Sequence, residues 1–153
     1  MKLATLTRVY HFSAAHRLHS PFLDEAENRA LYRDCNNYGG HGHNYVLEVT
    51  IKGPVEPRTG MIFDLVQFDR VVNERVIQHV DHQFIGMREF PADMSEEDAF
   101  ISTSEVITYQ IWTWLMDAFP AGVQLKRIRL EETGSNHFEY RGEDHPARLG
   151  VPA

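Results

Sequence analysis

Apolar and polar residues alternate along two segments near the N-terminus, which predicts two β-strands at 3–15 and 41–53. Two more alternating segments, 123–132 and 137–141, lie near the C-terminus. The residues between them, 133–136 (Thr-Gly-Ser-Asn), have the composition of a tight turn. The chain is therefore predicted to begin and end with a β-hairpin.

A different period occupies the middle of the chain and predicts two helices. Apolar residues recur at three- and four-residue steps over about 65–79, after Asp64 as N-cap and Gln67 at the third helical position. Residues 102–105 (Ser-Thr-Ser-Glu) have the form of a second capping box, and apolar residues as far as Ala118 then share one face.

The remaining segments show no strong period. Residues 17–34 carry many charges, and we expect a loop that can contain a helical turn. Residues 83–101 include an acidic patch at 93–98 and are expected to form a long exposed loop. The tail at 143–153 is expected to be weakly ordered.

This order, ββ-α-α-ββ, predicts a single α+β domain over 1–153, with a four-stranded antiparallel sheet and two helices on one face. Such a sheet leaves two edge strands unpaired, and assembly with other copies of the chain would cover them.

Composition limits the function classes. With 153 residues and 42% hydrophobic residues, the chain can bury a substantial core. A net charge of −7 argues against nonspecific binding to nucleic acid or to an anionic membrane. A single cysteine rules out an internal disulfide, and no apolar run reaches the length of a membrane span. We therefore expect a cytoplasmic protein.

The strongest chemical signal is the pair His41 and His43, separated by Gly42 at the start of the second predicted strand. Alternate residues of a strand share a face, about 6.5–7 Å apart, so both imidazoles can reach one cation. His16 closes the neighbouring strand and is the best third ligand; three histidines would leave an open position, as in a catalytic zinc site. Surface or core histidines without a metal are the alternative. A cupin-type motif is disfavoured because Glu48 falls on the opposite face.

Four further groups are candidates for chemistry. Cys35, the only thiol, lies among polar residues and would serve as a base if a nearby dication lowered its pKa, although a small buried residue is the commoner role. Asp81 and His82 form a possible carboxylate–imidazole pair, but adjacent residues of an extended segment face apart. Glu132 points inward from a strand and needs a partner, either a ligand or a structural arginine. Glu105 is interpreted as the capping-box acid.

Six motifs occur in a fixed order along the chain: 12–18 (FSAAHRL), 35–45 (CNNYGGHGHNY), 59–65 (TGMIFDL), Asp81-His82, 102–105 (STSE) and Glu132-Thr133. With these motifs the sequence resembles the 6-pyruvoyl-tetrahydropterin synthase family over about residues 8–142. The resemblance implies a T-fold, in which three subunits close their sheets into a barrel and two trimers stack into a homohexamer with active sites between subunits.

The resemblance also implies roles for the candidate residues. It implies Zn²⁺ on three histidines: His16, His41 and His43. Cys35 is implied as the general base, with Asp81 and His82 as its proton-transfer partners from the same or another subunit.

Substrate contacts are implied for a second set of residues. Glu132, immediately before a threonine, is implied to anchor the pterin ring, in agreement with its inward position on a strand. Thr103, Ser104 and Glu105 are implied to contact substrate. The groups that bind triphosphate do not follow from the motifs, and Arg17 is only a candidate.

The implied reaction converts 7,8-dihydroneopterin triphosphate to 6-pyruvoyl-tetrahydropterin with elimination of triphosphate. It needs no external redox cofactor, and the sequence has no glycine-rich dinucleotide loop. The five residues between Cys35 and His41 are similar to the spacing in the pyruvoyl-forming branch. The alternatives are a 6-carboxy-5,6,7,8-tetrahydropterin synthase of queuosine biosynthesis and a non-catalytic zinc- or pterin-binding protein on the same scaffold.

Overall fold

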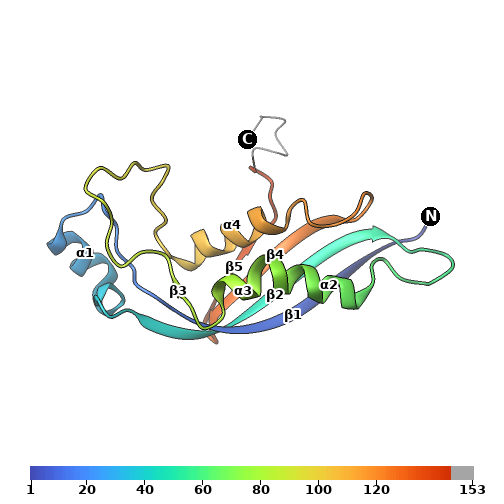
Figure 1. Ribbon diagram of the computed structural model, residues 1–153, viewed down its shortest axis with the longest axis horizontal. Coiled ribbons are helices and arrows are strands. Elements are labelled where there is room, and N and C mark those ends of the chain that lie inside the picture. Colours follow the sequence, from blue (N-terminus) through green and yellow to red (C-terminus); the bar gives the residue numbers. More distant parts are fainter. Residues whose placement is uncertain (146–153) are drawn as a thin grey trace.

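The fold is built on a curved β-sheet (Figure 1). The structure is a computed structural model and describes residues 1–145. The sheet has five strands in the spatial order β3-β1-β2-β4-β5. Their bounds are β1 Leu3–His16, β2 His41–Pro54, β3 Phe84–Ile85, β4 Gln124–Thr133 and β5 Asn136–Tyr140. The four strands predicted from sequence are therefore present, with ends shifted by only a few residues.

The prediction of four antiparallel strands is incomplete. β1 pairs antiparallel with β2 along its whole length, β2 with β4, and β4 with β5. β3 instead pairs in parallel with the end of β1, through Ala15 and His16, so the sheet is mixed. A strand of two residues is too short to show an alternating pattern, and its place is set by tertiary contacts.

One long helical segment and one shorter helix cover the same face of the sheet (Figure 1). The long segment runs through α2 (Leu65–Val72), a π-helical turn (Asn73–Ile77) and α3 (Gln78–Val80). It agrees with the helix predicted over about 65–79. The second predicted helix is α4, Ser104–Leu115, which ends before Ala118.

Residues 17–34 contain more structure than a loop with a helical turn. Helix α1 spans Glu25–Tyr32 and is followed by a 3₁₀ turn, η1, at Arg33–Asn36. A complete capping box begins α1: the Asp24 side chain accepts from the Glu27 N–H, and the Glu27 side chain accepts from the Asp24 N–H. The helix was not predicted because its surface is mostly polar, so it has no apolar period.

Helix caps explain where the other helices start. The Asp64 side chain accepts from the Gln67 N–H at 2.9 Å, as predicted for an N-cap. At α4 the N-cap is Thr103, whose hydroxyl accepts from the Val106 N–H, and not Ser102. Glu105 is therefore at the second helical position and is not a capping-box acid.

The core lies between the sheet and these helices. From Tyr45 onward, alternate β2 residues such as Leu47 and Val49 are fully buried, and they meet Phe68 of α2 and Ile111 of α4 in one cluster. The same alternation, continued back along β2, places His43 and His41 on this helix-covered side. Thus the face that forms the core also carries the histidines.

Residues 86–103 connect β3 to α4 without regular structure. The loop predicted at 83–101 is therefore present, except that it contains the two-residue strand β3. Within residues 1–145, no helix is long and apolar enough to span a membrane. The predicted weakly ordered tail, 143–153, lies for the most part outside the described residues.

Candidate functional site

Three histidines converge where β1 ends and β2 begins. The antiparallel register pairs His16 with His41 and Ala14 with His43, so the three rings share one face. One ring nitrogen from each lies within 4.8 Å of the other two. In the described part of the chain, this is the one group of histidine, cysteine and acidic side chains close enough to hold a metal ion.

Hydrogen bonds fix which nitrogens face the centre of this histidine cluster. His16 Nδ1 lies 2.6 Å from the Ser102 carbonyl oxygen; a carbonyl only accepts, so Nδ1 carries the proton and Nε2 keeps its lone pair. His16 Nε2 is 3.0 Å from His41 Nε2. Two further buried ring nitrogens, His41 Nδ1 and His43 Nε2, have no hydrogen-bond partner among the described residues.

The protonation state of the histidine cluster suits a cation. Burial lowers the pKa of His16, His41 and His43 below the ordinary histidine value. Neutral imidazoles with converging lone pairs are the ligands that zinc takes in catalytic sites. The buried nitrogens without partners fit such an ion, and the backbone acceptor on His16 is the usual support for a metal-bound imidazole.

Two neighbours hold the rings in place. Gly40 has φ +74°, and a Cβ there would lie 2.7 Å from both the His16 carbonyl oxygen and the Phe84 ring. Tyr45 is fully buried beneath the cluster, with its ring 5.5 Å from His43 and 6.3 Å from His16 between centroids. The close approach of β2 to β1 at this end therefore requires glycine, and an aromatic residue supports the rings.

Glu132 reaches the histidine cluster from β4. Its Oε1 lies 3.4 Å from His43 Nε2 and 3.5 Å from His16 Nε2, while Oε2 accepts from Asn136 Nδ2 at 2.9 Å. The side chain is 14% exposed. The inward orientation predicted for Glu132 is therefore observed, and its partners are histidines and an amide in place of an arginine.

Cys35 lies in η1, half-buried, and its backbone carbonyl accepts from the Leu18 N–H at 2.8 Å. Burial raises the pKa of the thiol, and the carboxylates of Glu132 and Asp34 raise it further. Without a cation the site therefore holds a protonated thiol, and the lower pKa expected for a base requires a positive charge nearby.

Asp81 and His82 do form a pair, although neighbouring residues were expected to face apart. His82 has φ +58°, which turns its ring back so that Nδ1 lies 3.0 Å from Asp81 Oδ2. Asp81 Oδ1 accepts from the Ser13 N–H at 3.0 Å, and the His82 N–H donates to the Ser13 carbonyl at 2.7 Å. The pair is thus fixed to the outer edge of β1.

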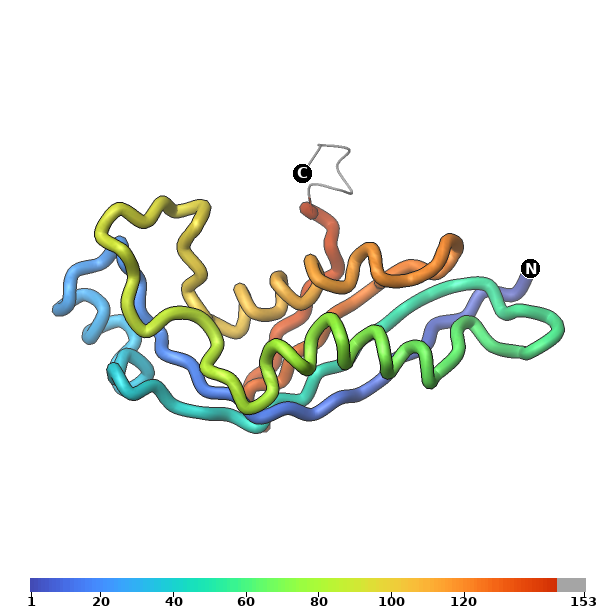
Figure 2. Tube along the Cα trace, viewed as in Figure 1, coloured from blue at the N-terminus to red at the C-terminus, as the bar shows by residue number. Residues whose placement is uncertain are grey.

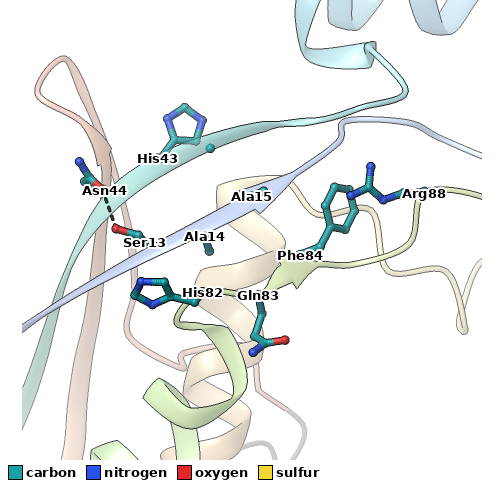
Figure 3. A pocket seen from close by; sticks show the side chains of 10 residues that line it. Ser13, Ala14, Ala15, His43, Asn44, His82, Gln83, Phe84 and Arg88 are labelled. Carbon is teal, nitrogen blue, oxygen red and sulfur yellow. Dashed lines mark hydrogen bonds between the residues drawn. The ribbon is translucent and has the colours of Figure 1, made fainter.

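The pair lies apart from the histidine cluster of the same chain. The His82 side chain is 82% exposed and lines an open groove of about 470 Å³, to which His43 also contributes, but His82 is not part of the group of three converging histidines (Figure 3). In Figure 3 the His82 ring lies beside β1 and the His43 ring lies beyond β2, with both strands between them. A single chain therefore does not bring His82 to the three histidines.

The residues expected to contact substrate at the start of α4 have different surroundings. Thr103 uses its hydroxyl as the N-cap, and Glu105 is exposed. Ser104 is buried, and its hydroxyl interacts with the hydroxyl of the fully buried Tyr45. Burial raises the pKa of Tyr45 well above its usual range, and the Glu132 carboxylate adds to this effect.

Two contributors to the site were not predicted. Ser102 acts through its backbone carbonyl, which has no side-chain signal in the sequence. Tyr45 has the same strand parity as His41 and His43, and that parity was sufficient to place it under the cluster.

Comparison with known proteins gives consistent matches over nearly the whole chain. The sequence model of the family described as 6-pyruvoyl tetrahydropterin synthase matches residues 5–143. The 6-pyruvoyl tetrahydrobiopterin synthase of Homo sapiens is 38% identical over 140 residues, which are 92% of this chain and 92% of that protein.

A solved structure and a more distant relative extend these matches. The structure of Caenorhabditis elegans 6-pyruvoyl tetrahydropterin synthase is 37% identical with a TM-score of 0.79, and the match covers 94% of this chain and 98% of that one. The putative 6-carboxy-5,6,7,8-tetrahydropterin synthase of Archaeoglobus fulgidus is 33% identical over 101 residues, which are 66% of this chain and 75% of that protein.

Proposed function

Because this chain belongs to the 6-pyruvoyl tetrahydropterin synthase family, we propose that it converts 7,8-dihydroneopterin triphosphate to 6-pyruvoyl-tetrahydropterin and releases triphosphate. The observation that carries the proposal is the cluster of His16, His41 and His43, with the Glu132 carboxylate beside it. The reaction balances without an external oxidant, since the ring imine is reduced at the expense of the side-chain carbons.

In this proposal His16, His41 and His43 hold Zn²⁺. When bound, the ion supplies Lewis-acid chemistry that acidifies the side-chain hydroxyls and the adjacent C–H groups of the substrate. The neutral state of the three imidazoles and the Ser102 acceptor on His16 support this role.

Protein groups would move the protons. Cys35 is the proposed general base, and the thiol is already close enough to Glu132 for the carboxylate to raise its pKa. His82, polarised by Asp81 at 3.0 Å, is the proposed partner that gives and takes protons.

Substrate would be oriented from the opposite side of the cluster. The Glu132 carboxylate, part-buried and inward-facing, would accept two parallel N–H donors of the pterin ring. We assign further contacts to the segment Thr103, Ser104 and Glu105, because it directly follows Ser102, whose carbonyl contacts His16 of the cluster.

We propose that the complete site forms between subunits of a T-fold homohexamer, a dimer of trimers in which the sheets close into barrels. β1 has β2 on one side, but within the described part of the chain only Ala15 and His16 pair with a strand on the other side, which leaves most of a 14-residue edge without a partner strand there. The His82–Asp81 pair sits on this edge. A neighbouring sheet would therefore supply the groups that one chain keeps apart. The lone cysteine favours a reducing, cytoplasmic location.

The 6-carboxy-5,6,7,8-tetrahydropterin synthase reaction is the second candidate, and the match to the Archaeoglobus fulgidus relative favours it. It starts from the same substrate and uses the same site, so the product decides between the two. A non-catalytic protein that binds zinc or pterin is the third reading, and it predicts no turnover.

Product analysis tests these readings. Zinc-loaded protein is incubated with 7,8-dihydroneopterin triphosphate, and the pterin is identified by mass. We expect a 6-pyruvoyl product and free triphosphate; a 6-carboxy product with acetaldehyde would assign the second reaction. No product from protein with zinc bound and its assembly intact would contradict the enzymatic proposal.

A matched variant tests the base. Cys35→Ala should retain zinc and assembly but lose turnover by about 10²–10⁴-fold, the usual contribution of a general base. Turnover within a few-fold of the unchanged protein would show that Cys35 is not the base.

A further inference from the structure

We propose that a groove beside α1 is the anion site that holds the triphosphate of the substrate before it leaves. The groove has a volume of about 690 Å³ and is lined on its basic side by Arg17, Arg29, Arg33 and His19. Nothing in the sequence motifs assigns residues to this part of the substrate. The inference rests on the proposed function, which supplies a triphosphate ester as the substrate.

The groove is built from the two segments that carry the proposed reacting groups. Arg17 directly follows His16, and its Nε donates to the Asn36 carbonyl at 2.9 Å. Asn36 directly follows Cys35, and its side-chain amide donates to the Leu18 carbonyl at 2.8 Å. Residues of the groove wall are therefore direct chain neighbours of the proposed metal ligand and base. In Figure 2 the light-blue segment that contains α1 lies beyond one end of the sheet.

This position suits the chemistry. In the substrate the triphosphate ester is on the terminal carbon of a three-carbon side chain, one carbon beyond the two hydroxyl-bearing carbons proposed to react at the histidine cluster. The leaving group must therefore lie near the cluster, and the groove lies one residue along the chain from His16, at Arg17, and from Cys35, at Asp34 and Asn36.

The charges in the groove are free to bind an anion. In residues 1–145, none of Arg17, Arg29 and Arg33 takes part in an ion pair within 4.0 Å. The three guanidinium groups face two carboxylates in the lining, Glu25 and Asp34, so the local balance is positive on a chain of net charge −7. Guanidinium groups bind phosphate oxygens through paired, charge-assisted hydrogen bonds.

Two donors are already oriented. Arg17 uses Nε for the Asn36 carbonyl and Nη1 for the Arg88 carbonyl at 2.6 Å, which holds the guanidinium rigid and leaves Nη2 for a ligand. His19 Nδ1 lies 3.0 Å from the Asn36 side-chain nitrogen. That amide nitrogen is a donor, so Nδ1 accepts and the proton of a neutral ring lies on Nε2.

Arg33 adds a conformational observation. Its φ is +51°, a region that favours glycine, and it is the first residue of η1, the turn that carries Cys35. Unfavourable backbone conformations of non-glycine residues concentrate at functional sites, where the surrounding structure holds them. Here the Arg33 N–H donates to the Arg29 carbonyl, so this backbone bond closes the last turn of α1, and both residues line the groove.

Calorimetric titration of the zinc-loaded protein with inorganic triphosphate tests the site. The double variant Arg29→Gln/Arg33→Gln should bind triphosphate at least about 10-fold more weakly, since two charge-assisted contacts are lost. Glu25→Gln removes a competing carboxylate and should bind about 2- to 5-fold more tightly. Arg58→Gln, an exposed arginine in a turn far from the groove, is the matched control and should bind as the unchanged protein does.

The opposite directions of these effects separate a binding role from a loss of folding. Triphosphate affinity that is the same in the double variant, or lower in Glu25→Gln, would overturn the assignment. Dihydroneopterin lacks phosphates, so the double variant should bind it with the same affinity as the unchanged protein. If the double variant lost affinity for dihydroneopterin as well as for triphosphate, the groove would not be specific for phosphate.

Turnover distinguishes this inference from the proposed function. If the protein forms product but the double variant keeps the same KM and the same triphosphate affinity, the groove assignment fails and the proposed function stands. If triphosphate binds with the expected dependence on the arginines but no product forms, the anion site stands and the proposed reaction fails.

Discussion

At the scale of single residues, the histidine cluster depends on one backbone group. The Ser102 carbonyl holds the proton of His16 on Nδ1 and so keeps Nε2 free, while His41 and His43 rely on strand register and on the Tyr45 ring beneath them. The three neutral imidazoles are therefore already positioned as ligands before a cation binds.

Removal of one histidine ligand should strongly weaken zinc binding. We expect His43→Ala to weaken zinc binding by more than about 100-fold, because loss of a ligand exceeds the 10- to 100-fold effect of outer groups. Zinc per chain after dialysis against a weak chelator measures this. His79→Ala replaces an exposed histidine far from the cluster and should keep the zinc; equal zinc content in the two variants would contradict the ligand assignment.

Strand parity was sufficient to predict some of these side chains. His41 and His43 share a face because they are two residues apart on a strand, and Glu132 turned inward as its parity required. The Asp81–His82 pair was not predictable in this way, since a positive φ at His82 overrides the alternation of an extended segment. The Ser102 contact was invisible for another reason: any residue has a carbonyl oxygen.

At the scale of elements, α1 and the loop before it are held together by one buried side chain. Asn28 is fully buried; its Oδ1 accepts from the Ser20 N–H at 2.8 Å, and its Nδ2 contacts the carbonyls of Ser20, Leu23 and Asp24 at 2.9–3.1 Å. A helix of eight residues has little stability of its own and needs such an anchor.

We expect Asn28→Ala to lower the free energy of unfolding by about 2–4 kcal/mol, because the buried Ser20 N–H loses its acceptor and the carbonyls of Ser20, Leu23 and Asp24 each lose a donor. Urea denaturation followed by circular dichroism measures the change. Asn73→Ala makes the same substitution at an exposed helical position and should cost less than about 0.5 kcal/mol. A similar loss in both variants would show that the Asn28 network is not stabilising.

Two neighbouring glycines should respond very differently to alanine. Gly40 has φ +74° and no room for a Cβ, whereas Gly39 has no atom within 4 Å of the added position. Gly40→Ala should destabilise the protein by about 1–3 kcal/mol and loosen the His16–His41 pair; Gly39→Ala should change stability by about 0.5 kcal/mol or less. Thermal unfolding and zinc affinity of the two variants give the comparison, and equal behaviour would refute the steric argument.

The long elements followed from local pattern and the short ones did not. β1 and β2 alternate over 14 residues each, and α2 starts at the N-cap that Asp64 predicted. β3 has two residues and is defined by its parallel contact with β1. α1 is polar on most of its surface, so its sequence has no apolar period; the Asp24–Glu27 capping box is the feature that marks where the helix begins.

At the scale of the whole molecule, the outer edge of β1 has backbone groups that another β-strand could pair with. The backbone groups of Ser13 and Ala15 point away from β2, toward Asp81, His82 and Gln83. By alternation the N–H of Val9 also points to this edge, where no strand within residues 1–145 pairs with it.

This geometry predicts the effect of proline at the edge. Val9→Pro removes an N–H that the β1–β2 ladder does not use, so the subunit should remain folded while pairing with another sheet is blocked. Native mass spectrometry should show a shift from the proposed hexamer to smaller species, with the circular dichroism spectrum unchanged. A folded variant that still forms the full assembly would contradict a subunit contact along β1.

The hydrogen bond from His16 to Ser102 spans 86 residues, and this separation has a consequence for biosynthesis. All three histidines leave the ribosome early, within the first hairpin, but the acceptor that orients His16 comes much later and Glu132 later still. Synthesis at about 5–20 residues per second delays the finished arrangement by several seconds. A chain that ends before residue 102 therefore carries His16, His41 and His43 but lacks the carbonyl that orients His16.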